Sequence, residues 1–135
     1  MSLASERLAL SLAAASVVVK PLLTAGAQVS TAKPVTIQLQ DLAGDSVARV
    51  QRLECTVRRS DGLQTVVGEV TLSETGVGVE VTTTAKATLI ITTDANGAAT
   101  LTLTNASGGA LSNMHLVVQP IDLPGVRTSL LISLT

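Results

Sequence analysis

The chain has 135 residues, the length of one domain, of which 46% are hydrophobic and 14% charged, with a net charge of −1. This composition excludes a disordered tail, and it argues against a nucleic-acid binder because phosphate contacts need a basic surplus. The absence of Phe, Tyr and Trp excludes base-stacking platforms and aromatic cages for amines. Cys55 is the only cysteine, which excludes an internal disulfide and a thiolate metal cluster. His115 is the only histidine, and these two counts together remove most hydrolase and metalloenzyme chemistry.

The lack of aromatic residues also bears on stability. Aromatic side chains usually bury the largest areas in cores and interfaces. Here the core has to be built from Val, Leu, Ile and Ala, with Thr at its margins. We therefore expect part of the apolar surface to be buried against copies of the chain or against a larger partner.

The N-terminal segment, residues 1–27, is interpreted as an arm or anchor outside the main domain, which is expected to span residues 28–135. Leu8 and Leu12 fit one face of a short helix, whereas Leu8, Leu10 and Leu12 fit strand alternation equally well. The Ala-rich centre favours a helix, and the run before Pro21 favours extended chain.

A secretory signal peptide is the competing interpretation of the same segment. The apolar run from residue 8 to residue 19 resembles the core of such a peptide, and small residues at 24–27 resemble a cleavage context. Glu6 offsets Arg7, which argues against it, and the run is shorter than the ~20 residues of a membrane span.

Beyond Pro34 the chain alternates between strand and turn patterns. Apolar residues alternate with polar ones at 35–39 and again at 53–57, which predicts two half-buried strands and places Cys55 on an inner face. Asp41–Asp45 and Ser60–Gly62 have turn composition. Weaker strand patterns follow at 65–72 and 77–81, the first interrupted by Gly68.

Residues 87–105 carry the clearest pattern in the chain. Leu89 and Ile91 alternate with Thr88, Ile90 and Thr92 before the turn sequence Asp94–Gly97, and Leu101 and Leu103 alternate with threonines after it. Asp and Asn bond their own backbone and Gly accepts positive φ, so this segment predicts a β-hairpin. The spacing is not that of a calcium loop, since its required Gly and Glu are absent.

Two further strands are expected at 114–119 and 127–134, with Leu130, Ile132 and Leu134 on one face of the last. Seven to nine short strands separated by regular turns, without a convincing helix after residue 20, predict an all-β fold built as an antiparallel two-sheet β-sandwich.

Two stretches resemble a known family. VTIQLQDLAGDSVA (residues 35–48) resembles the opening of bacterial immunoglobulin-like domains of the invasin type, and TTDANGAATLTLT (residues 92–104) resembles their characteristic hairpin. The format also resembles small structural proteins of tailed-bacteriophage virions. The resemblance covers about residues 28–135 and implies an immunoglobulin-like antiparallel β-sandwich, and such modules carry no catalytic residues.

The candidate functional residues are interface residues, and no catalytic, metal-binding or cofactor-binding residue is predicted. The apolar arm is the expected anchor. Arg49, Arg52, Arg58 and Arg59 form a basic cluster, for which a solvated face is the default interpretation; the sharper hypothesis is a surface that pairs with acidic groups of a neighbouring subunit. Arg52 and Arg58 share an outer strand face with Glu54 between them, so the charge of this cluster is partly neutralised, which favours the solvated face. The predicted interface residues are Leu3, Leu8, Leu10, Leu12, Val17, Val18, Val19, Arg52, Arg58 and Arg59.

From these features we expect a non-enzymatic virion protein of a tailed phage, a capsid decoration or cement subunit or part of a head or tail fibre. Its partners would be copies of itself, with a trimer favoured, and a larger assembly such as the major capsid protein, without nucleic acid or membrane. The alternative is a secreted adhesion module at the bacterial surface, with residues 1–27 as signal peptide. An enzyme is not expected, because one histidine and no cofactor fingerprint leave little for catalysis.

Overall fold

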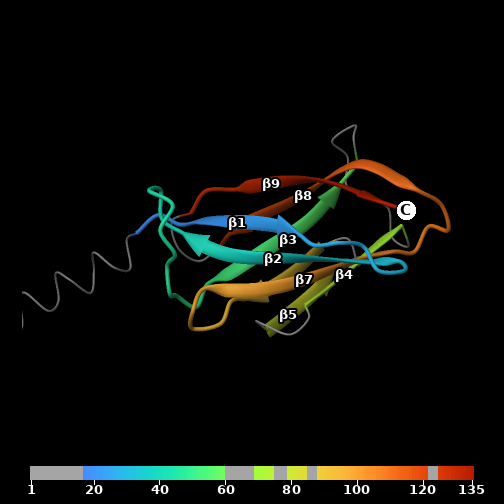
Figure 1. Ribbon diagram of the computed structural model, residues 1–135. Coiled ribbons are helices and arrows are strands. Elements are labelled where there is room, and N and C mark those ends of the chain that lie inside the picture. Colours follow the sequence, from blue (N-terminus) through green and yellow to red (C-terminus); the bar gives the residue numbers. More distant parts are fainter. Residues whose placement is uncertain (1–16, 60–68, 75–78, 85–87, 122–124) are drawn as a thin grey trace, which may run out of the picture.

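The protein is a β-sandwich (Figure 1). The computed structural model describes residues 17–59, 69–74, 79–84, 88–121 and 125–135, and these residues form strands without a helix. The strands are β1 (Lys20–Ala25), β2 (Ala32–Gln40), β3 (Arg52–Arg58), β4 (Val70–Glu74), β5 (Val79–Thr84), β6 (Thr88–Thr92), β7 (Ala98–Asn105), β8 (Leu111–Pro120) and β9 (Thr128–Leu134). The predicted all-β class is thereby confirmed.

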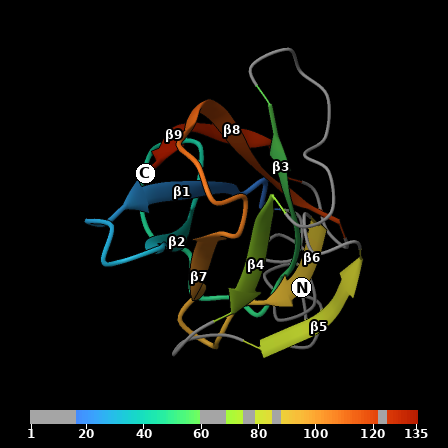
Figure 2. The ribbon, with the colours of Figure 1, turned by 90° about the vertical axis from the view of Figure 1, so that its right-hand side faces the viewer.

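The strands form two antiparallel sheets that pack face to face (Figures 1 and 2). The four-stranded sheet has the order β1-β2-β7-β4, and the five-stranded sheet has the order β5-β6-β3-β8-β9. The inner faces carry the apolar residues that the alternation predicted to point inward, including Cys55, Leu101 and Ile132. The buried core consists of Val19, Val35, Ile37, Leu39, Leu53, Cys55, Val57, Val70, Leu72, Leu89, Ile91, Ala99, Leu101, Leu103, Met114, Leu116, Val118, Ile132 and Leu134.

The segment predicted as a β-hairpin contains both expected strands, but these two strands do not pair with each other. β6 pairs with β3 and β5, whereas β7 pairs with β2 and β4, so the chain between them crosses from one sheet to the other. The hairpin prediction is wrong, and the segment is an arch (Figure 2). Alternation reports which side chains are buried, and both strands bury theirs in the same core. The alternation carries no information on which strands pair through their backbones, so it could not distinguish a hairpin from an arch.

The turn of the arch is held by Asp94. Its carboxylate oxygen accepts hydrogen bonds from the backbone N–H groups of Asn96 and Ala98, both at 2.9 Å. The N–H of Gly97 donates to the Asp94 carbonyl oxygen at 3.0 Å, and Gly97 has a φ of +75°. The composition predicted this turn on the same physical grounds. A short acidic side chain takes the place of backbone hydrogen-bond partners, and glycine adopts the left-handed conformation.

The turn after β2 repeats this geometry. The Asp41 carboxylate accepts from the N–H groups of Ala43 and Asp45, at 3.0 and 2.9 Å, and Gly44 occupies the left-handed position with a φ of +92°. One Asp-x-x-Gly pattern thus builds two turns at the same end of the sandwich.

The sandwich begins earlier than the expected boundary between residues 27 and 28. β1 pairs with β2 over its whole length, from Lys20 opposite Gln40 to Ala25 opposite Val35. Pro21 lies inside β1, which an edge strand tolerates because one side of its backbone needs no hydrogen-bonded neighbour. Residues 20–25 therefore belong to the sandwich rather than to the arm.

Candidate interaction surfaces

Only the part of the predicted anchor from Val17 onward lies within the described residues. Leu3, Leu8, Leu10 and Leu12 lie outside the described residues. Val17 packs against the core, Val18 is half-buried and Val19 is completely buried in the chain's own core. The Val19 carbonyl oxygen accepts a hydrogen bond of 2.8 Å from the N–H of Val126, and Val19 forms a parallel bridge with Gly125. The segment just before β1 is thus part of the folded domain.

Arg49 connects this segment to the interior. Its Nη1 donates to the Val17 carbonyl oxygen at 3.2 Å, and its Nε donates to the side-chain oxygen of Gln51 at 3.1 Å. Gln51 is only 2% exposed, and its backbone N–H donates to the hydroxyl of Thr93 at 2.9 Å. Burial lowers the pKa of the Arg49 guanidinium from its ordinary value. Arg49 lies near Arg52 in the sequence, but its hydrogen bonds to Val17 and Gln51 place its side chain at the end of the sandwich where β1 begins.

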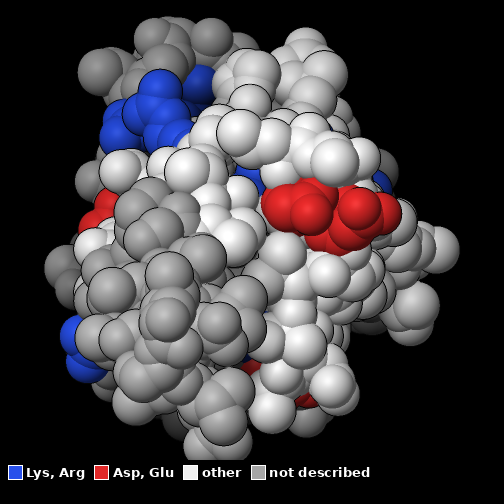
Figure 3. All heavy atoms as spheres, turned by 90° about the vertical axis from the view of Figure 1, so that its left-hand side faces the viewer, with Lys and Arg blue, Asp and Glu red and all other residues white. Residues whose placement is uncertain are grey.

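The same end carries exposed apolar side chains. Val50 follows Arg49 directly, Ile121 donates its N–H to the Arg52 carbonyl oxygen, and Val126 bonds Val19. Val50 is 57% exposed, and Ile121 and Val126 are each 42% exposed. We call these three residues the arm end. Figure 3 views this side of the molecule, where much of the described surface is uncharged, with one large acidic group and a basic group at some distance from it.

The remaining predicted arginines lie on or beside the outer face of the five-stranded sheet. Arg52 and Arg58 are exposed on β3, with half-buried Glu54 between them. Arg59, which follows β3, is half-buried. The predicted sharing of one strand face by Arg52, Glu54 and Arg58 is confirmed.

The sheet brings two further groups to Arg58 that sequence reasoning did not place there. His115 on β8 is the direct cross-strand neighbour of Arg58, and such neighbours on one face have Cβ atoms about 5 Å apart. Arg127 precedes β9, whose Ser129 is the cross-strand neighbour of Val117. Only the β3–β8–β9 register joins these residues, and no local sequence signal reveals it.

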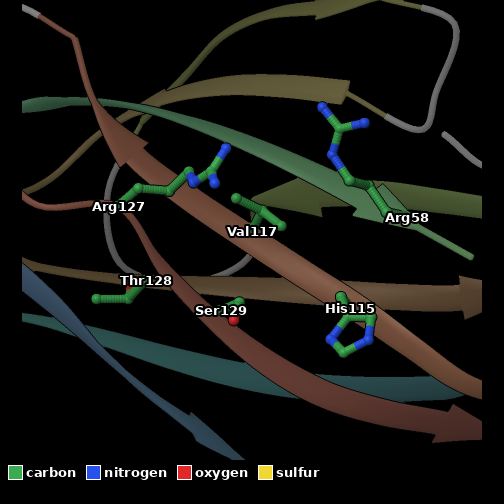
Figure 4. Close-up of a pocket in the computed structure, with 6 residues that line it drawn as sticks. All are labelled: Arg58, His115, Val117, Arg127, Thr128 and Ser129. Atoms are coloured by element: carbon green, nitrogen blue, oxygen red, sulfur yellow. The ribbon is translucent and has the colours of Figure 1, made fainter. Parts of the chain in front are cut away.

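These residues border a hollow of about 300 Å³. Its lining consists of Arg58, His115, Val117, Arg127, Thr128 and Ser129. Figure 4 shows Arg58 and Arg127 on either side of Val117, with Ser129 between Thr128 and His115. The Thr128 hydroxyl donates to the Pro21 carbonyl oxygen at 2.8 Å. We call this the outer-face hollow.

A second hollow, of about 260 Å³, lies at the end of the sandwich opposite the arm end. Thr31, Asn105, Gly108, Gly109, Ala110 and Thr135 line it. Its main polar side chain is already used within the chain, since the Asn105 amide nitrogen donates to the Gly109 carbonyl oxygen at 2.7 Å and its oxygen accepts from Ser107. This arrangement stabilises the loop after β7 and offers little to a ligand.

Among the residues that the structure describes, groups suited to metal or thiol chemistry lie apart. In the described ranges, no three His, Cys, Asp or Glu side chains gather as a metal site would require. Cys55 is buried, and burial, with a smaller contribution from the Glu54 charge, raises the pKa of its thiol. A neutral buried thiol acts as a small apolar group rather than a nucleophile. No helix in the described part of the chain is long and apolar enough to cross a bilayer.

No family model matches this chain, and no curated protein matches its sequence. Among solved structures, the chain is similar to part of a β-glucuronidase from Parabacteroides merdae, with 15% identity and a TM-score of 0.41. The match covers 84% of this chain and 12% of the length of that enzyme. The likeness is too low to assign a fold family or an activity.

Proposed function

We propose that this chain is a non-enzymatic structural subunit of a tailed-phage virion, a capsid decoration or cement protein or part of a head or tail fibre. It would act by mass action. A subunit that binds only the assembled lattice stabilises that lattice by its binding free energy, repeated over many copies. Homo-oligomerisation, with a trimer favoured, belongs to the same proposal, as does the immunoglobulin-like character of the sandwich.

The arm end is the observation that carries this proposal. Residues 1–16, whose only charged side chains are Glu6 and Arg7, join the sandwich at Val17. Val50, Ile121 and Val126 are exposed beside that point. An apolar segment attached next to exposed apolar side chains gives a subunit apolar groups to bury against a neighbour.

The position of β1 weighs against the alternative of a secreted adhesion module. Cleavage after residue 27 would remove β1 and Val19, and therefore a complete edge strand and a buried core side chain. A domain with small aliphatic core residues has little stability to lose in this way. This favours retention of residues 17–27 in the mature protein.

Two experiments test the proposal. Virions purified by density gradient from the native source should contain the chain in a fixed ratio to the major capsid protein, with its N-terminus upstream of Val17. A mature N-terminus near Gln28, with the chain on the cell surface, would support the adhesion module instead. In parallel, sedimentation velocity should show an oligomer for the full chain and a monomer for a variant that begins at Val17. Identical sedimentation of the two would refute the anchoring role of residues 1–16.

A further inference from the structure

The outer-face hollow gathers donors from three strands around one apolar floor. Arg58 comes from β3, His115 from β8 and Ser129 from β9, with Arg127 directly before β9. Figure 4 shows the two arginines flanking Val117. Guanidinium groups present several N–H donors in a fixed planar arrangement that matches oxyanions.

The lining of the hollow is basic, whereas the chain as a whole carries a small negative charge. The chain carries a net charge of −1, yet none of the described residues that line the hollow is acidic. Glu54 is the carboxylate on the same face of β3. It lies two residues from Arg52, about 7 Å along the strand, and four residues from Arg58, about 13 Å. Along β3, Glu54 is therefore closer to Arg52 than to Arg58.

The shape and chemistry of the lining limit the ligand class. Val117 is half-buried and offers a small apolar floor, and the chain has no Phe, Tyr or Trp ring to stack on a sugar or a base. The Thr128 hydroxyl proton is committed to Pro21, which leaves the Ser129 hydroxyl as the donor on the β9 side. Recognition must therefore rest on charge and hydrogen bonds from several directions. A carboxylate has two oxygens, whereas a tetrahedral group presents more acceptors to donors on three strands.

We propose that the outer-face hollow is a binding site for a tetrahedral oxyanion, the phosphate or sulfate group, either free or carried as an ester on a larger molecule. Arg58 and Arg127 bind its oxygens from opposite sides of Val117, and His115 and Ser129 donate from the neighbouring strands. Both arginines are exposed, so the affinity is modest and falls as salt is added. This site does not depend on the assignment of the chain to a virion.

The test is an amide NMR titration of the full ¹⁵N-labelled chain at constant ionic strength. The probes are inorganic phosphate, glycerol 3-phosphate as a phosphate ester and acetate as a carboxylate. We expect saturable shifts confined to residues 58, 115–117 and 127–129 with both phosphates, and weaker binding of acetate. Equal affinity for the two phosphates would identify the bare group as the ligand, and tighter binding of the ester would identify an ester-bearing molecule. Absence of saturable shifts with either phosphate would overturn the proposal.

Charge-matched variants separate a site from a diffuse basic surface. Arg58→Gln and Arg127→Gln should each weaken phosphate binding about tenfold, because each removes a hydrogen bond to a charged group. Arg52→Gln removes the same charge from the same face beyond Glu54 and should leave binding within about twofold. Equal weakening by all three variants would show general electrostatic attraction and refute the site. Native circular dichroism of each variant excludes unfolding as the cause.

Discussion

Gly97 lies against the backbone of Val47, and a β-carbon added to Gly97 would clash with the Val47 carbonyl oxygen. The Gly97 carbonyl oxygen accepts a hydrogen bond of 2.9 Å from the N–H of Leu39. The N–H of Val47 donates to the Leu39 carbonyl oxygen, also at 2.9 Å. The arch between the sheets, the end of β2 and the segment after the Asp41 turn therefore meet at a glycine with no room for a side chain.

Gly97→Ala should destabilise the domain far more than Gly44→Ala. Both glycines have left-handed φ values, which cost a residue with a β-carbon about 1–2 kcal/mol. At Gly44 an added β-carbon meets nothing within 4 Å, whereas at Gly97 it meets immobile backbone. We expect a loss of about 1 kcal/mol for Gly44→Ala and more than about 3 kcal/mol for Gly97→Ala. Urea unfolding followed by far-ultraviolet circular dichroism measures both, and equal losses would contradict the tight packing at Gly97.

Leu101→Asp should prevent folding, because it places an unpaired charge at a position with 0% exposure in the centre of the core. Thr100→Asp is the matched control. Thr100 is the adjacent residue of β7 and its side chain is half-buried on the opposite face. We expect the control to give a folded protein with native circular dichroism. If Leu101→Asp were soluble and folded, the assignment of the inner face of β7 would be refuted.

Individual residues show what the sequence could and could not predict. Alternation placed Cys55, Leu101 and Ile132 correctly, because burial of a strand face depends on local residue order. The same order could not reveal that β6 and β7 lie in different sheets, nor that β1 belongs to the sandwich. The outer-face hollow could not be predicted from the sequence for a related reason. Arg58, His115 and Arg127 are far apart in the chain, and only the register of three strands brings them together.

Cys55 should make stability depend on pH in the alkaline range. Burial raises the pKa of its thiol in the folded chain, whereas the unfolded thiol ionises near its ordinary pKa of about 8.5. The contribution is therefore fully present below that pH and is lost as the pH rises above it, since only the unfolded state releases the proton. The stability of wild type minus that of Cys55→Ala should fall by about 2 kcal/mol between about pH 7.5 and about pH 10.

Thiol labelling provides an independent check on Cys55. A disulfide reagent such as Ellman's should modify the native protein only as fast as the domain opens, and the urea-unfolded protein at once. A constant difference between wild type and Cys55→Ala across the pH range, together with rapid labelling of the native protein, would mean that the thiol is accessible.

Two N-terminal deletions should differ in stability although they differ by only three residues. Removal of residues 1–16 leaves Val17, the carbonyl oxygen bound by Arg49 and the buried Val19 in place. If residues 1–16 serve a neighbouring subunit, as proposed, the monomeric domain should keep its free energy of unfolding within about 0.5 kcal/mol. Removal of residues 1–19 also takes away a buried valine, worth about 1.5–3 kcal/mol, and the acceptor for Val126, worth about 1 kcal/mol. Urea unfolding should therefore show a further loss of about 3 kcal/mol in the longer deletion. Equal stability of the two variants would mean that the sandwich does not need Val17–Val19, and cleavage downstream of them would regain support.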